Sequence, residues 1–439
     1  MNQTPRWPGA ALGLYLAAGW AAAPLARPLL ARRLGRGKEE AARLPERLGE
    51  AGQPRPEGRL VWLHGASLGE TASMAPLIEA LLDRDDAPAV LVTAGTVTAA
   101  RRLAMTLPPG ARHQYVPVDT APAVRRFLAH WRPDLAIWVE SEFWPGLMWR
   151  TARAGVPMML VNARVSASSA RAWGRVPGMA RRLLGLFAGI ATQDRETLDR
   201  LRALGAPAGR IRHAGNLKAL IPPPAAPAGA VEAARAALAG RPAWLAASTH
   251  EGEEAAVLDA HRRLAESHPG LVTILAPRHP ERAGAIAALA GGLALARRSR
   301  GEGPPPGGVW LADTLGEMGL WYRLAPVAFV GGSLVARGGH NPFEPAALGA
   351  AILHGPHTAN FAPAYAAVAA VGGAQAVEDG ETLALAVAAL MAPDGRPGPR
   401  HAAVTAAART ALAAEQPDVA ALAAEAMALM ASTSPGPAP

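Results

Sequence analysis

The sequence predicts an α/β protein with two doubly wound domains, each built around a parallel sheet. One observation that predicts it is the alternation of short apolar runs with longer helical patterns, which is typical of parallel strands connected by helices. A second is the segment IPPPAAPAGA at residues 221–230, which has the composition of a linker and divides the chain of 439 residues into similar halves. At about 150 residues per domain, the length also fits two or three domains.

Each expected strand is a short apolar run. In the first half these runs are residues 60–63, 89–93, 115–118, 135–139, 158–161 and 189–192. In the second half they are residues 244–247, 271–276, 309–312, 327–330 and 351–354. The alanine-rich residues 400–430 are expected to form one or two final helices. In two linked domains of this class, ligands usually bind in a cleft at the carboxyl ends of the strands.

Charge and composition favour an anionic partner. The 44 basic and 35 acidic residues give a net charge of +9, and all the basic residues except Lys38 and Lys218 are arginines. This balance favours phosphates, nucleotides or an anionic lipid surface. The arginines are scattered and form no stripe interleaved with aromatic residues, which argues against nucleic acid. The absence of cysteine excludes disulfides, thiolate metal ligands and a cysteine nucleophile.

The amino-terminal residues 7–26 carry no charge and precede a basic segment with Arg27, Arg32, Arg33, Arg36 and Lys38. Because positive charge stays on the cytoplasmic side, this pattern predicts an uncleaved membrane anchor, spanning the bilayer or lying in its interface. The alternative is an amphipathic helix buried in a soluble protein. The predicted organisation is an anchor and basic flank at 1–40, a first domain at 41–220, the linker at 221–230 and a second domain at 231–439.

The segment WLHGASLGE at residues 62–70 follows an expected strand and opens a helix. Ser67 and Glu70 fit the capping box Ser-x-x-Glu, which is a purely structural role. Gly65 and Gly69 would let the backbone approach a ligand closely. A carboxylate at a strand-to-helix turn is also well placed to act as a general base. The pattern leaves both roles of Glu70 open.

The segment WVESEFWPG at residues 138–146 places Glu140 and Glu142 at the carboxyl end of an expected strand. Their spacing would point both side chains to one face while the strand lasts. Carboxylates at such an edge are costly unless they are solvated or paired. They are therefore either functional groups or partners of arginines such as Arg164 or Arg150.

Lys218 closes the segment GNLK at residues 215–218, just before the linker. Its compact ammonium group suits a point contact to a phosphate or a carboxylate. The alternative is a solvated surface lysine, which is the usual case.

The second half has several segments of this kind at strand ends. Ser248 and Glu251 in ASTHEGEE fit a helix cap. Arg278 in APRHPER can bind a phosphate with two hydrogen bonds. In DTLGEM, Thr314 is expected to be an N-cap, with Gly316 near a helix start whose free amides favour anions.

The segment FVGGSLVARGGHNPFEP at residues 329–345 combines two glycine pairs with Ser333, His340 and Asn341. Asn341, Pro342 and Glu344 fit the first positions of a helix. Because four glycines exceed what capping requires, we expect backbone amides of this loop to face an anion. Walker, GxGxxG and HExxH motifs are absent, and the polar DRDD at 83–86 is interpreted as surface, so no metal site is expected.

Taken together, nine segments resemble the motifs of the 3-deoxy-D-manno-octulosonic acid (Kdo) transferase family. They are HGASLGE, VESEFWPGL, VNARVSASS, GNLK, ASTHEGEE, PRHPER, DTLGEM, FVGGSLVARGGHNPFEP and HGPHTANF. They keep the family's order between about residue 60 and residue 361. The apolar amino terminus is similar to the family as well.

The resemblance implies a GT-B glycosyltransferase that moves Kdo from CMP-Kdo to a lipid A precursor (lipid IVA) in lipopolysaccharide biosynthesis, without a cofactor. It places the protein at the anionic inner membrane surface, peripheral or single-pass, with its domains on the cytoplasmic side. The first half would bind the acceptor and the second half the donor. Glu70 would be the general base, and Glu140 and Lys218 would stabilise the transition state. The implied CMP-binding residues are Pro277, Arg278, Leu315, Gly316, Glu317, Asn341, Pro342, Phe343 and Glu344.

The chain departs from the family pattern at two places. Leu315 and Met318 exchange the residue types usual around the Gly-Glu of the nucleotide segment. Ala219 and Leu220 stand where the family often has an aromatic residue and an aspartate, which puts a contact of that pair in doubt. Two other functions stay open. One is a GT-B enzyme or epimerase that uses a UDP-sugar, and the other is a non-catalytic basic protein of a membrane surface or nucleic acid.

Overall fold

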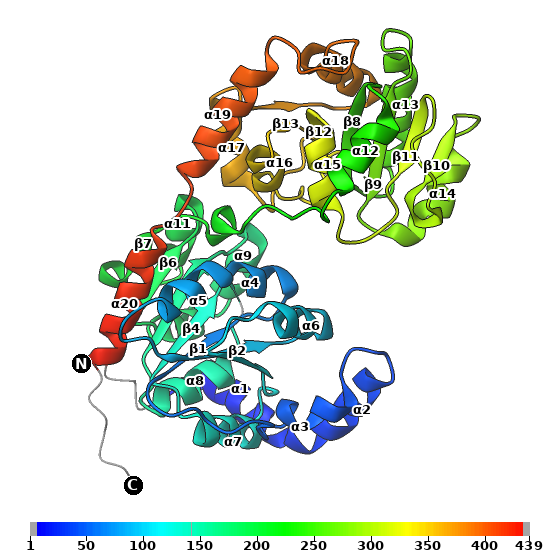
Figure 1. The fold of residues 1–439 in the computed structure, drawn as a ribbon. Coiled ribbons are helices and arrows are strands. Elements are labelled where there is room, and N and C mark those ends of the chain that lie inside the picture. Colours follow the sequence, from blue (N-terminus) through cyan, green and yellow to red (C-terminus); the bar gives the residue numbers. More distant parts are fainter. Residues whose placement is uncertain (1–6, 142, 433–439) are drawn as a thin grey trace. The chain divides into compact units, whose positions relative to one another are not determined.

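A computed structural model describes residues 7–141 and 143–432 of the chain. They form two compact units (Figure 1). Unit 1 comprises Met1–Ile221 and Gln416–Pro439, and unit 2 comprises Pro222–Glu415. Each unit contains a seven-stranded sheet whose neighbouring strands are parallel. The α/β class and the division into two doubly wound parts are therefore confirmed.

The sheet of unit 1 has the order β3-β2-β1-β4-β5-β6-β7. Its strands are β1 (Leu60–His64), β2 (Ala89–Ala94), β3 (Ala111–Tyr115), β4 (Leu135–Val139), β5 (Met158–Ala163), β6 (Gly189–Thr192) and β7 (Ile211–His213). Every residue of the adjacent strands β1 and β4 is buried, because helices cover both faces of a parallel sheet. Glu70 and Glu140 follow these two central strands.

The helices of unit 1 cover both faces of its sheet. The α-helices are α1 (Ala10–Ala21), α2 (Ala26–Leu34), α3 (Leu44–Arg47), α4 (Leu68–Ser73), α5 (Ala75–Leu82), α6 (Val97–Thr106), α7 (Ala121–Trp131), α8 (Pro145–Arg153), α9 (Ala167–Gly174), α10 (Pro177–Leu184), α11 (Arg195–Ala203) and α20 (Val419–Ala431). The 3-10 helices are η1 (Ala23–Leu25), η2 (Ala41–Arg43), η3 (Ala208–Arg210) and η4 (Leu217–Leu220). One apolar cluster contains Trp62, Phe127 and Trp138, and a second contains Val61 and Met427.

The sheet of unit 2 has the order β10-β11-β9-β8-β12-β13-β14. Its strands are β8 (Ala243–Thr249), β9 (Val272–Pro277), β10 (Leu295–Arg297), β11 (Gly308–Leu311), β12 (Val327–Val330), β13 (Ala351–His354) and β14 (Ala374–Ala376). Its helices are α12 (Ala230–Leu238), α13 (Glu253–Ala265), η5 (Pro280–Arg282), α14 (Ala283–Leu289), η6 (Arg298–Arg300), α15 (Met318–Leu324), α16 (Phe343–Ala347), α17 (Ala362–Ala370), α18 (Gly380–Leu390) and α19 (His401–Ala413).

Some strands differ from those expected. The strand predicted at residues 115–118 is β3 at Ala111–Tyr115, whose polar His113 and Gln114 are buried. The amide oxygen of Gln114 is satisfied there, because Oε1 accepts a hydrogen bond of 2.7 Å from Trp131 Nε1. The edge strands β7, β10 and β14 were not expected, since each is three residues long and carries no strong apolar signal.

The expected final helices are two, and they belong to different units. α19 lies in unit 2, whereas α20 lies in unit 1 and packs against α5 (Figure 1). Residues 231–439 therefore do not form one compact unit. Pro417 and Asp418 separate the helices, and Asp418 caps α20 by accepting a hydrogen bond of 2.9 Å from Ala421 N.

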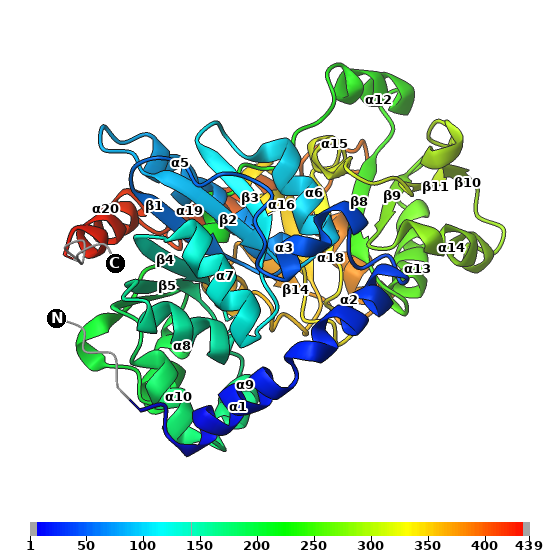
Figure 2. The same cartoon turned by 90° about the horizontal axis from the view of Figure 1, so that it is seen from below.

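The amino-terminal helix α1 packs against α7, α8 and α10 of unit 1 (Figure 2). Its Leu12 is 1% exposed, but Leu14 is 74% and Trp20 is 65% exposed. Within the uncharged residues 7–26, α1 thus has one docked face and one free face, and η1 and the start of α2 follow it. Within the described part of the chain, no helix is long and apolar enough to cross a membrane.

Acid sensitivity is expected from His64 at the end of β1. The ring is fully buried, its Nδ1 lies 2.9 Å from Thr93 Oγ1, and burial lowers its pKa to about 4. The unfolded chain takes up this proton near the ordinary pKa of about 6.5, so folding stability falls as the pH drops from 6.5 toward 4. Between pH 7.5 and pH 5.0, we expect the melting temperature of His64→Gln to fall less than that of the wild type.

The matched control for this prediction is His213→Gln. His213 is exposed on the edge strand β7 of the same unit, so this variant should follow the acid sensitivity of the wild type. Parallel melting curves for His64→Gln and the wild type across this pH range would show that His64 is not responsible.

Candidate active site

The turn between β1 and α4 holds Glu70 through a capping box. Ser67 is the N-cap residue, and its Oγ accepts a hydrogen bond of 3.4 Å from Glu70 N. In return, Glu70 Oε2 accepts hydrogen bonds of 2.6 Å from Ala66 N and 3.4 Å from Ser67 N. The capping role expected from the sequence is confirmed. The same bonds fix a carboxylate at the carboxyl end of a central strand.

Gly65 is closely packed in this turn. A Cβ at residue 65 would lie 2.4 Å from Met74 Cε and 3.0 Å from Glu70 Cβ. A Cβ at Gly69 would meet nothing within 4 Å. The close approach made possible by Gly65 is thus to the protein's own helix.

Glu140 and Lys218 form an ion pair, although they are far apart in the sequence. Lys218 Nζ lies 2.6 Å from Glu140 Oε1, and the side chains are 17% and 9% exposed. Lys218 is therefore not a solvated surface lysine, and the partner of Glu140 in this pair is a lysine rather than an arginine. Glu140 has a backbone φ of 63°, in the region that favours glycine. Glu142, the other predicted carboxylate, lies outside the described residues.

Asn162, which the sequence reasoning did not single out, positions Lys218. It lies near the end of β5 with a φ of 53°, and its Oδ1 accepts a hydrogen bond of 3.0 Å from Leu217 N. Asn216 Oδ1 accepts another of 3.0 Å from Lys218 N. The short helix η4, which carries Lys218, packs against α4, which carries Glu70. These contacts bring the three predicted catalytic residues to one edge of the sheet of unit 1, and we call Glu70, Glu140 and Lys218 the unit 1 cluster.

In unit 2, the predicted CMP-binding residues share one edge of the sheet. Arg278 follows β9, Leu315 and Gly316 follow β11, and residues 341–344 follow β12. Because β11, β9, β8 and β12 are consecutive and parallel, their carboxyl ends lie at the same edge. Pro277 is buried as the last residue of β9, whereas Arg278 is exposed and Leu315 is 79% exposed.

The segment around Glu317 differs from its prediction. The N-cap position of α15 is occupied by Glu317, and the hydroxyl of Thr314 donates a hydrogen bond to the Glu317 carboxylate. Arg298 Nη2 lies 2.8 Å from Glu317 Oε1, and this contact holds the pKa of Glu317 below its ordinary value. Glu317 is thus an ionised carboxylate with a cationic partner that the sequence reasoning missed.

The helix expected to start after Asn341 begins one residue late. α16 starts at Phe343, so Pro342 takes the N-cap position and Glu344 the second position of the helix. Asn341 still caps it, because its Oδ1 accepts a hydrogen bond of 3.0 Å from Phe343 N and its Nδ2 donates one of 3.2 Å to Glu344 Oε1. Burial raises the pKa of Glu344.

The glycine loop after β12 does face an anion, but three of its amides bind the protein's own carboxylate. Glu253 is fully buried and accepts hydrogen bonds of 2.7, 2.9 and 2.9 Å from the backbone N–H groups of Gly332, Ser333 and Leu334. His250 N donates a fourth, of 2.8 Å. The expectation that these amides cradle a ligand is therefore wrong. Glu253 also begins α13, so the predicted cap of Ser248 and Glu251 is not formed.

A histidine pair lies beside Arg278 at this edge. His250 Nε2 and His340 Nε2 are 2.9 Å apart, and their rings stack with centroids 5.1 Å apart. The His279 ring centroid lies 5.6 Å from that of His250. Burial, His250 and Arg278 lower the pKa of His340 to about 4, so its ring is uncharged at neutral pH. Across the described residues, no group of three or more His, Cys, Asp or Glu side chains could hold a metal ion.

Comparison with known proteins identifies the family. Residues 42–221 match the family model of 3-deoxy-D-manno-octulosonic acid transferase (kdotransferase). The enzyme of that name from Bordetella pertussis is 40% identical over 353 residues, which are 77% of this chain and 81% of that protein.

Two solved structures are also similar. One is the C-terminal CMP-Kdo binding domain of WaaA from Acinetobacter baumannii, with 32% identity, a TM-score of 0.38, and coverage of 42% of this chain and 98% of that chain. The other is Anabaena Alr3699/HepE in complex with UDP, with 13% identity, a TM-score of 0.54, and coverage of 86% of this chain and all of that chain. HepE shows the fold alone, in agreement with the predicted GT-B type. The similarity to the Bordetella enzyme establishes the family. The chain belongs to the 3-deoxy-D-manno-octulosonic acid transferase family, whose members are glycosyltransferases.

Proposed function

We propose that this enzyme transfers Kdo from CMP-Kdo to a hydroxyl group of a lipid A precursor, by a single displacement that inverts the anomeric carbon. Membership of the family supports Kdo transfer in lipopolysaccharide biosynthesis. The observation that carries the proposed mechanism is the unit 1 cluster, in which two carboxylates and one ammonium group converge at a strand edge. Unit 1 binds the acceptor in this proposal, and unit 2 binds the donor.

Glu70 is the proposed general base. It takes the proton of the acceptor hydroxyl as that oxygen attacks the anomeric carbon of Kdo, and the bond from this carbon to the CMP phosphate breaks. The capping box supports the role, because two backbone amides hold the carboxylate in place at the carboxyl end of β1. A base fixed in this way needs little reorganisation when the hydroxyl arrives.

Glu140 and Lys218 are the proposed stabilisers of the transition state. Positive charge grows on the sugar ring as the phosphate bond breaks, and a carboxylate stabilises such charge. Lys218 can meet the carboxylate of Kdo or the growing charge on the phosphate, because an ammonium group makes point contacts. Fixed charges of this kind act without reorganising during the reaction.

The donor site is proposed at the carboxyl edge of unit 2. Arg278 would receive the phosphate of CMP, and the segments at residues 315–317 and 341–344 would bind the nucleoside. The exposed Arg278 lies beside the pair of His250 and His340, of which His340 is uncharged at neutral pH, and this supports the placement. The departing CMP carries its negative charge toward these groups, which can stabilise it.

We further propose that the enzyme works at the anionic cytoplasmic surface of the inner membrane. The free face of α1, with Leu14 and Trp20, and the exposed Arg27 and Arg32 of α2 support peripheral attachment. A substrate with acyl chains is presented at such a surface.

The proposed reaction is tested by product mass. The protein is incubated with the lipid A precursor, Kdo, CTP and a CMP-Kdo synthetase, because the synthetase joins Kdo to CTP with release of pyrophosphate and so supplies CMP-Kdo continuously. We expect the acceptor to gain the mass of one or more Kdo residues. An acceptor of unchanged mass, or gain of a sugar from a UDP-sugar donor instead, would contradict the proposal.

Glu70→Gln should reduce turnover by about 10²–10⁴-fold, the usual contribution of a general base. The amide oxygen can still accept from Ala66 N, so the melting temperature should change by at most about 2 °C. The control Ser67→Ala removes the cap, which lowers stability by about 1 kcal/mol but should leave most of the activity. Near-normal turnover by Glu70→Gln would reduce Glu70 to a capping residue.

Arg278→Ala should weaken CMP binding by about 10–100-fold in calorimetry, the equivalent of a lost charged contact of about 1.5–3 kcal/mol. Arg300 is exposed on η6, so Arg300→Ala is the control and should bind CMP normally. Unchanged CMP affinity in Arg278→Ala would move the phosphate site elsewhere, and tighter binding of UDP than of CMP by the wild type would overturn the donor assignment.

A further inference from the structure

A cavity in unit 1, separate from the unit 1 cluster, lies where α1, α7 and α8 meet. Its volume is about 690 Å³. Leu128 and Ala129 of α7 contribute apolar wall, while Arg125, Arg150 and Arg153 add three guanidinium groups. Trp20, near the end of α1, also lines it. The cavity therefore combines positive charge with an apolar surface, and the proposed transfer reaction does not use it.

The three arginines lack carboxylate partners in the described part of the chain, where no acidic side chain lies within 4.0 Å of their nitrogens. Arg125 Nε donates to Ala121 O at 3.3 Å, and Arg150 Nη1 donates to Gly146 O at 3.1 Å, so both bond to backbone of their own helices. Burial is the main cause that lowers the pKa of Arg150, and the charge of Arg125 adds to it. A bound anion would relieve this repulsion.

One acidic residue acts on this group from a distance. Asp119 attracts Arg150, and one oxygen of its carboxylate is engaged by α1 and α8: Tyr15 Oη donates to Oδ2 at 2.9 Å, and Gly146 N donates to the same oxygen at 2.9 Å, whereas the buried Oδ1 accepts neither bond. Asp119 thus connects α1 to the start of α8 by hydrogen bonds. Because it is a single carboxylate, it does not neutralise all three arginines. Net positive charge is left to face the cavity.

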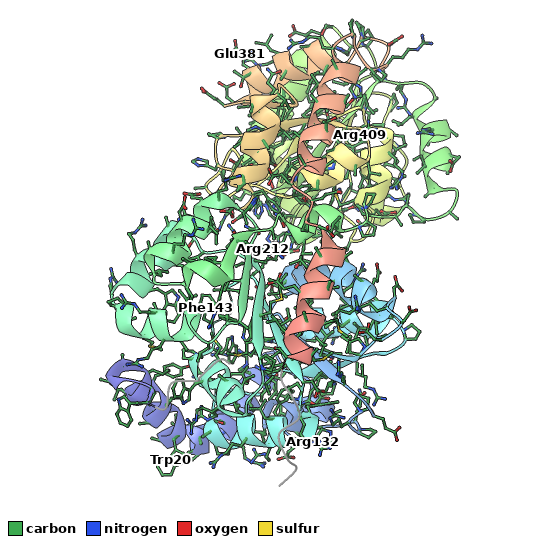
Figure 3. The ribbon with its side chains drawn as sticks, turned by 90° about the vertical axis from the view of Figure 1, so that its left-hand side faces the viewer. Trp20, Arg132, Phe143, Arg212, Glu381 and Arg409 are labelled. Atoms are coloured by element: carbon green, nitrogen blue, oxygen red, sulfur yellow. The ribbon has the colours of Figure 1, made fainter. Side chains whose placement is uncertain are left out.

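Trp20 and three leucines of the amino-terminal helices are exposed. Trp20 is 65% exposed and projects from the outer side of unit 1 (Figure 3). Leu14, Leu25 and Leu29 on α1, η1 and α2 are 74%, 65% and 56% exposed. Tryptophan beside aliphatic side chains and arginines is typical of a surface that enters the headgroup region of a bilayer.

We propose that this cavity binds the phosphate headgroup of one anionic membrane phospholipid, while Trp20 and the exposed leucines enter the bilayer beside it. Guanidinium groups match phosphate oxygens with paired hydrogen bonds, and the apolar wall suits the glycerol and the first part of the acyl chains. The site goes beyond general attraction to a negative surface, because it requires a particular cavity to be open.

The test measures partition into vesicles by sedimentation, without donor or acceptor, so it stands apart from the transfer reaction. Vesicles contain phosphatidylcholine with or without phosphatidylglycerol. Ala129 and Ala154 both line the cavity and are exposed. The variants Ala129→Trp and Ala154→Trp each fill the cavity with an indole ring and change no charge. We expect both to reduce the phosphatidylglycerol-dependent partition coefficient at least fivefold. Trp itself favours membranes, so a decrease is a stringent result.

The triple variant Arg125→Gln, Arg150→Gln, Arg153→Gln should reduce the same coefficient by at least about tenfold, since each arginine near an anionic surface adds to binding. The charge-matched control neutralises the exposed Arg102, Arg195 and Arg202 of α6 and α11, and Ala203→Trp on α11 is the control for the filling variants. Both controls should stay within about twofold of the wild type.

Three results would overturn the proposal. If both filling variants kept the wild-type partition coefficient, the protein would be attracted to anionic vesicles by its overall charge, without using the cavity. Displacement from vesicles by inorganic phosphate as effective as that by soluble dihexanoyl phosphatidylglycerol, at equal ionic strength, would make it a free phosphate site. Unchanged partition with a raised KM for the lipid A precursor in the filling variants would assign the cavity to the acceptor.

Discussion

The ion pair between Glu140 and Lys218 is the interaction on which the architecture of the unit 1 edge depends. Taking two charges into a largely buried position costs free energy that their attraction offsets only in good geometry. The chain secures that geometry with strained backbone at Glu140 and Asn162 and with two asparagine side chains around Lys218. Such strain persists only where the surroundings enforce it, and it is typical of functional sites.

Both units hold carboxylates at the carboxyl ends of their strands, but they do so differently. In unit 1, Glu70 is held by a capping box and Glu140 by an ammonium group. In unit 2, Glu253 is enclosed by four backbone amides and shapes the glycine loop. The unit 2 edge then presents the exposed Arg278, beside which the half-buried His340 is uncharged at neutral pH. A division between a base-bearing unit and a cation-bearing unit fits a transfer in which a hydroxyl loses a proton and a phosphate departs.

The sequence predicted most of the fold because buried parallel strands are apolar on both faces, as in β1 and β4. It failed where that signal is weak: β3 carries the buried polar residues His113 and Gln114, and the hydrogen bond from Trp131 to Gln114 Oε1 is a tertiary contact that the sequence does not reveal. The sequence also did not reveal that α20 belongs to unit 1 while α19 belongs to unit 2, because both helices are similarly rich in alanine.

The candidate residues of the site could be selected from the sequence, but their contacts could not be predicted. Glu70, Glu140 and Lys218 were selected from motifs and stay predictions, whereas the capping box expected from the spacing of Ser67 and Glu70 is present in the structure. Their partners were not, because pairs such as Lys218 with Glu140, or Asn162 with Leu217, join segments that only the fold brings together. The prediction that the glycine loop binds a ligand anion failed for a similar reason. Its amides bind the carboxylate of Glu253, which belongs to another element.

The central claim is that the Glu140–Lys218 pair takes part in the reaction as well as organising the unit 1 edge, and a double-mutant cycle tests it most directly. Turnover and melting temperature are measured for Glu140→Gln, Lys218→Met and the double variant. Either single change leaves one buried charge unpaired and should lower both quantities. The account predicts that the double variant, which buries no charge at this place, regains most of the melting temperature but stays at least about 100-fold below wild-type turnover. Recovery of turnover together with stability would contradict it.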